Sequence, residues 1–103
     1  MEFEVKVNDG KPVLITYDNE DEFSRCHNCT IADLDSLFIG AGNALDKKPV
    51  VNSGMFALLA GRHKTKPYRL IIYTSLYSDG YRLSKIDLSK LMAAMRTAGV
   101  VHG

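Results

Sequence analysis

The sequence predicts an α+β fold in which two β-hairpins form one mostly antiparallel sheet and about three helices pack on it. Two pairs of β-rich segments are each separated by an Asp-Gly dipeptide, at residues 9–10 and 79–80. The segments that follow each pair have apolar residues at helical spacing and capping residues. The 103 residues contain no linker or low-complexity tract, so we expect a single domain over residues 1–103.

The first hairpin is predicted over residues 2–17. Its first strand alternates polar and apolar side chains, which is the period of a strand with one buried face. Asp9-Gly10 is a favoured hairpin turn because both of its positions need a positive φ. A turn centred there places Val5 opposite Leu14, so the apolar side chains of both strands share one face. The second hairpin is predicted from residues 68–77 and 81–86, with its turn at Asp79-Gly80.

The helices are expected near residues 20–25, over residues 30–41, at residues 55–60 and over residues 87–98. Thr30 followed by Asp33 predicts a capping box at the start of the second helix, with Cys29 as part of a hydrophobic staple. Asp87 is the expected cap of the last helix, and Gly99 is expected to end it.

Cys26 and Cys29, within the stretch RCHNCT, have a spacing that occurs in zinc knuckles and in thiol oxidoreductases. A zinc site needs a second close pair of ligands, which the sequence lacks. An oxidoreductase places its first cysteine after a buried strand, whereas the residues before Cys26 are acidic. We therefore expect packed or free thiols and no metal or cofactor, and keep a small zinc-binding or redox protein as an alternative function.

Charge is divided between the two halves of the chain, although the formal net charge is only +1. Residues 1–46 contain ten acidic and three basic side chains, and residues 47–103 contain ten basic and two acidic ones. Such asymmetry indicates either a binding surface or neutralisation across the fold. Complementary halves also make self-association a hypothesis.

The segment GRHKTKPYR, residues 61–69, contains four basic residues and a tyrosine. Lysine and arginine can neutralise phosphates and a tyrosine can stack on a base, so a nucleic-acid-binding module using residues 62–69 is a second hypothesis. The nearly neutral net charge and the acidic half of the chain argue against it.

The leading hypothesis is a non-enzymatic binding protein, a regulator or inhibitor of a larger protein partner. No nucleophile-elbow, zinc-protease or P-loop motif occurs, so we expect no catalytic residues. Tyrosines and arginines around the second hairpin are typical of protein-binding hot spots. The candidate partner-binding residues are Arg62, Lys64, Lys66, Tyr68, Arg69, Tyr77, Tyr81 and Arg82.

The N-terminal residues lack the basic and apolar regions of a secretory signal peptide. No segment approaches the ~18 consecutive apolar residues of a membrane span. We therefore expect a soluble, cytoplasmic protein with no membrane partner.

Overall fold

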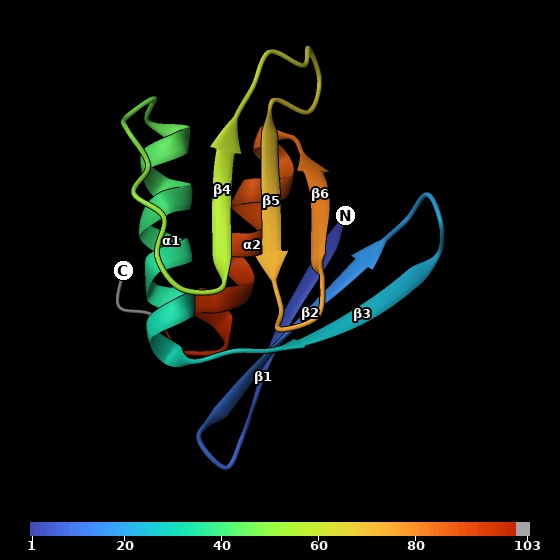
Figure 1. Cartoon of the computed structure of the whole chain (residues 1–103), viewed down its shortest axis with the longest axis vertical. Coiled ribbons are helices and arrows are strands. Elements are labelled where there is room, and N and C mark those ends of the chain that lie inside the picture. Colours follow the sequence, from blue (N-terminus) through green and yellow to red (C-terminus); the bar gives the residue numbers. More distant parts are fainter. Residues whose placement is uncertain (101–103) are drawn as a thin grey trace.

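The computed structural model describes residues 1–100, which form six strands and two helices (Figure 1). The elements are β1 (Glu2–Asn8), β2 (Lys11–Asp18), β3 (Phe23–Asn28), α1 (Ile31–Leu45), β4 (Phe56–Ala60), β5 (Tyr68–Tyr73), β6 (Ser78–Leu83) and α2 (Lys85–Thr97). Two three-stranded antiparallel sheets have the orders β1-β2-β3 and β4-β5-β6. The α+β class is confirmed, whereas the prediction of one sheet and about three helices is wrong.

The first sheet contains the predicted hairpin and one unpredicted strand. Val5 pairs with Leu14, and Asp9 and Gly10 have the positive φ values, 52° and 74°, of the expected turn. Residues 20–25 form no helix, because the acidic residues stabilise a turn that leads into β3. The Asp18 carboxylate accepts the backbone N–H of Glu20 at 3.0 Å, as is common for aspartate in turns.

Helix α1 begins with the predicted capping box. The Asp33 backbone N–H donates to the Thr30 hydroxyl at 3.1 Å, and the Thr30 backbone N–H donates to the Asp33 carboxylate at 3.0 Å. The helix extends beyond its predicted end at residue 41, because Ala41 and Ala44 continue the buried stripe.

Residues 55–60 contain strand β4, so the helix predicted there is wrong. A short apolar run fits either a buried strand or a helical turn, and pairing with β5 selects the strand here. The outer edge of β4 is covered at Leu58 by the side-chain amide of Asn52. That amide accepts the Leu58 N–H at 2.8 Å and donates to the Leu58 carbonyl at 3.2 Å.

The second hairpin is present, but its turn lies at residues 74–77 and Asp79-Gly80 lies inside β6. Thr74 stabilises the observed turn. Its backbone N–H donates to the Tyr77 carbonyl at 2.8 Å, and its hydroxyl accepts the Tyr77 N–H at 3.0 Å. These hydrogen bonds stabilise the turn at residues 74–77, which therefore does not need the glycine that a two-residue hairpin loop requires.

Helix α2 is capped by Ser84, whereas the sequence predicted Asp87 as the cap. Asp87 is instead the third helical residue, and its carboxylate accepts the Ser84 N–H at 2.9 Å. Gly99 follows the helix with φ +71°, as expected of a residue that ends one.

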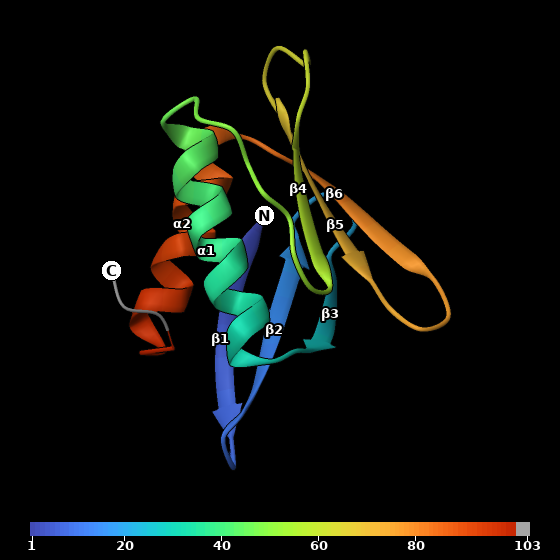
Figure 2. The same ribbon diagram turned by 60° about the vertical axis from the view of Figure 1, so that its left-hand side comes forward.

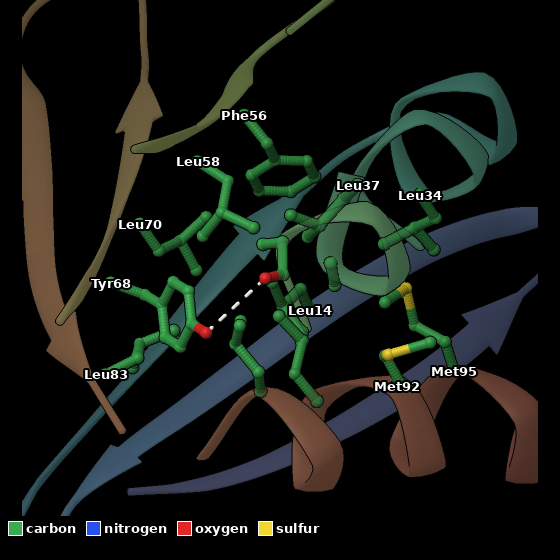
Figure 3. Close-up of a cluster of buried hydrophobic side chains, with 14 of the residues drawn as sticks. Leu14, Leu34, Leu37, Phe56, Leu58, Tyr68, Leu70, Leu83, Met92 and Met95 are labelled. Atoms are coloured by element: carbon green, nitrogen blue, oxygen red, sulfur yellow. Dashed lines mark hydrogen bonds between the residues drawn. The ribbon is translucent and has the colours of Figure 1, made fainter. Parts of the chain in front are cut away.

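One hydrophobic cluster connects both sheets with both helices (Figure 3). Leu14 of β2, Leu70 of β5 and Leu91 of α2 are completely buried. Figure 2 shows both helices on the same side of the β4-β5-β6 sheet. The opposite face of that sheet has no helix over it. Within residues 1–100, no helix is long and apolar enough to cross a membrane.

Candidate functional site

The uncovered face of the second sheet carries the most distinctive arrangement of side chains. Arg69 of β5 is the direct cross-strand partner of Arg82 of β6, and both are exposed. Leu59 of β4 pairs with Arg69 on its other side, which places an exposed apolar residue in the same row. Ile71 and Tyr73 extend this face along β5, because alternate residues of a strand point to the same side. We call these five residues the arginine face.

The two arginines of this face are a like-charge pair. Like charges directly opposite one another in a sheet are destabilising. Neither Arg69 nor Arg82 is among the ion pairs of residues 1–100, so no acidic side chain of this part of the chain is within ion-pair distance of either guanidinium. Two arginines without an ion-pair partner in residues 1–100 therefore occupy directly opposed positions on an open face.

A shallow pocket of about 330 Å³ lies at one end of the arginine face. Arg62, Arg69 and Arg82 line it together with Leu59 and Gly61. Arg62 is exposed and follows the end of β4. It lies close to Arg69 and Arg82 because β4 pairs with β5. We call this the arginine pocket.

The β5–β6 turn adds an apolar tip beside the arginine face. Leu76 is 89% exposed and Tyr77 is 59% exposed, which is unusual for such large side chains. Figure 2 shows this turn projecting away from the two helices. The Thr74 hydrogen bonds hold the tip in one conformation, so its apolar side chains can dock with little further ordering.

The basic loop between β4 and β5 brings further predicted residues together. Lys64 is exposed, whereas Lys66 is half-buried and forms a 3.2 Å ion pair with Glu20 of the β2–β3 turn. The His63 ring nitrogen Nδ1 accepts the Lys66 backbone N–H at 3.0 Å and thereby shapes the loop. A polar cleft of about 580 Å³ separates this loop from the β2–β3 turn, and Arg82 lies on its border.

Two of the predicted binding tyrosines are buried or half-buried. Tyr68 is only 6% exposed, and its hydroxyl donates to the Ala44 carbonyl of α1 at 3.4 Å (Figure 3). Its ring is therefore part of the core and is not free to stack on a base. Tyr81 is half-buried on the inward face of β6, where its hydroxyl accepts a hydrogen bond from Thr16 at 3.1 Å.

Tyr81 belongs to a group of polar side chains that meet between the two sheets, which we call the polar seam. The sequence did not predict it. Its hydroxyl lies 3.4 Å from Nε2 of the buried His27. Beside it, Arg25 of β3 donates to Asp79 of β6 at 2.7 Å. The residues of the seam are distant in sequence, so only the packing of one sheet on the other brings them together. No spacing motif could have revealed it.

We expect the seam to make stability pH-dependent through His27. Burial lowers the pKa of His27 below its ordinary value of 6.5, with a smaller opposing contribution from Asp79. As pH falls below 6.5, the unfolded chain therefore takes up the proton first and the free energy of unfolding decreases. Thermal unfolding should show a steeper loss of Tm as pH falls below 6.5 in the native protein than in His27→Gln.

His63→Gln is the control for this experiment, since His63 is an exposed histidine outside the seam. The steeper loss of Tm that His27→Gln removes should remain in this variant. Equal slopes for the native protein and His27→Gln would show that the seam does not control the pH dependence.

The two cysteines do not share a site. Cys26 is exposed on β3, whereas Cys29 is partly buried at the start of α1 and its thiol points to the Pro12 carbonyl at 3.7 Å. Burial raises the pKa of Cys29 to about 11, which leaves it a poor nucleophile. Among residues 1–100, no group of three or more histidine, cysteine or acidic side chains is arranged to hold a metal ion.

The charged halves of the chain are partly neutralised across the fold. Four of the five ion pairs found in residues 1–100 join the first 46 residues to the remainder. Lys90 with Glu2, at 2.7 Å, and Lys66 with Glu20 each pair a base of the second half with an acid of the first.

Comparison of the chain with protein-family models, curated proteins and solved structures found no match.

Proposed function

We propose that the protein is a small non-enzymatic binding protein that regulates or inhibits a larger protein partner. It docks through the arginine face and the apolar tip of the β5–β6 hairpin. The observation that carries the proposal is the cross-strand Arg69–Arg82 pair, which has no ion-pair partner among residues 1–100. A like-charge pair that costs stability is best explained by an acidic partner in another molecule.

The surroundings of the pair support a protein as that partner. Arginine and tyrosine are enriched among residues that dominate binding energy, and here Tyr73 lies on the same face of β5 as Arg69 and Tyr77 is exposed in the β5–β6 turn. Leu59 and Leu76 add exposed aliphatic surface, which packs against a protein surface better than against a phosphate backbone.

A single charge reversal tests the proposal, because it should affect stability and binding in opposite directions. Arg82→Glu converts the repulsive cross-strand pair into an attractive one, worth ~0.2–1 kcal/mol, and should raise Tm by a few degrees. The same variant should lose a partner that the native protein captures by affinity purification from its native cells. Calorimetry measures the first effect and quantitative mass spectrometry the second.

Lys11→Glu is the matched control, since it makes the same charge change at an exposed strand residue of the other sheet. It should retain the partner. A partner recovered equally with Arg82→Glu would refute the proposed binding face.

Nucleic-acid binding through residues 62–69 is the second candidate, supported by the exposed Arg62 and Lys64. Burial of Tyr68 and neutralisation of Lys66 by Glu20 weaken it. It predicts binding of random oligonucleotides at ~50 mM salt that weakens steeply as salt rises. Lys64→Glu combined with Lys66→Glu should abolish that binding, and fluorescence anisotropy measures it.

A further inference from the structure

We infer that the arginine pocket is an oxyanion site that receives carboxylate side chains from an acidic segment of the protein partner. This inference rests on the proposed function and specifies the chemistry of the partner. It concerns Arg62, Arg69 and Arg82, which line the pocket from the end of β4, from β5 and from β6.

The Arg69 side chain lies along the surface of the sheet. Gly80 pairs with Ile71 and is two residues from Arg82 on the same face of β6. A Cβ atom at position 80 would lie 3.5 Å from Nε of Arg69 and 3.6 Å from Nη2. The Arg69 guanidinium therefore lies over β6 beside Gly80, on the same face as Arg82.

The three guanidinium groups are available to a ligand. None of them is within ion-pair distance of an acidic side chain in residues 1–100. Arg25, by contrast, is occupied by Asp79 at 2.7 Å. Each free guanidinium has a planar fork of donors that matches the two oxygens of a carboxylate. Leu59 provides the apolar wall that lowers the local dielectric and strengthens such contacts.

A carboxylate fits this pocket better than the phosphates of a nucleic acid. The aromatic side chain that lines the pocket, Tyr68, is buried and offers no face for base stacking.

The test uses the full chain and an acetylated, amidated tetraglutamate peptide as the probe. NMR of the arginine Nε–Hε groups should show saturable shifts at Arg62, Arg69 and Arg82, and little change at Arg25 and Arg96. The corresponding tetraglutamine peptide should produce no shifts. The double variant Arg69→Lys with Arg82→Lys keeps the charge but loses the planar forks, and should bind tetraglutamate ~10-fold more weakly.

Several outcomes would overturn the inference. One is unchanged affinity in the lysine double variant, because point charges would then suffice. Another is shifts of similar size at all arginines, which indicate diffuse attraction. Tighter binding of an oligothymidylate than of the peptide at ~50 mM salt would assign the pocket to nucleic acid. The proposed function fails by a different result, namely retention of the captured partner by Arg82→Glu.

Discussion

Replacing Gly54 with alanine should destabilise the protein by roughly 2–5 kcal/mol, through backbone strain and overpacking together. Gly54 has φ +80°, a conformation that a residue with a Cβ atom adopts at a cost. A Cβ atom there would also overlap a carboxylate oxygen of Asp33 and lie 3.2 Å from its Cγ. Chemical denaturation at equilibrium measures the expected loss.

The Asp33 carboxylate has little freedom to move away from such a Cβ atom. One of its oxygens accepts the Thr30 N–H at 3.0 Å in the capping box of α1, and the other accepts the Met55 N–H at 3.3 Å. Displacing the carboxylate would therefore weaken both the start of α1 and the entry to β4.

Gly10→Ala is the matched control for the effect of φ alone. Gly10 has φ +74°, but a Cβ atom there would have no neighbour within 4 Å. Its replacement should cost only ~1–2 kcal/mol, the penalty of the left-handed conformation. Equal losses for the two variants would contradict the role assigned to the contact between Gly54 and Asp33.

Features set by neighbouring residues could be predicted from the sequence. The Asp9-Gly10 turn fixes the pairing of Val5 with Leu14, and the Thr30–Asp33 capping box starts α1. Both depend on groups only a few residues apart, whose preferences act before any tertiary contact forms.

Features decided by distant contacts could not be predicted in this way. Residues 23–28 and 56–60 are strands because β2 and β5 provide edges for them to pair with. The sequence does not distinguish these strands from helical turns. β3 follows acidic turn residues, and β4 is a short apolar run, and both patterns also occur at helices. With β3 and β4 added, each predicted hairpin becomes part of a separate three-stranded sheet.

Strand alternation decides which of the predicted site residues lie at the surface. Arg69 and Arg82 lie on the open face, as a binding role requires, whereas Tyr68 and Tyr81 point inward. Alternation of Tyr68 and Leu70 with Arg69 was readable in the sequence, so the burial of Tyr68 could have been predicted. The arginine pocket could not, because it requires the register of three strands.

Leu14→Ala should reduce the free energy of unfolding by roughly 3–4 kcal/mol. Leu14 is 0% exposed on the central strand of the first sheet, and its side chain enters the cluster shared with the second sheet and both helices (Figure 3). The cavity left by its removal has walls from several elements that cannot all move inward. Truncation at such a position costs both the transfer free energy and the cavity.

Ile15→Ala is the control, since Ile15 is the next residue of the same strand and points to the outer, half-exposed face of the first sheet. Its truncation should cost about 1 kcal/mol, because only part of the side chain leaves an apolar environment. The comparison also tests the register in which β1 pairs with β2. A slip of one residue would exchange the faces of the two side chains, and Ile15→Ala would then be the more damaging change. That result would reject the pairing of Val5 with Leu14 on which both the core and the placement of the seam depend.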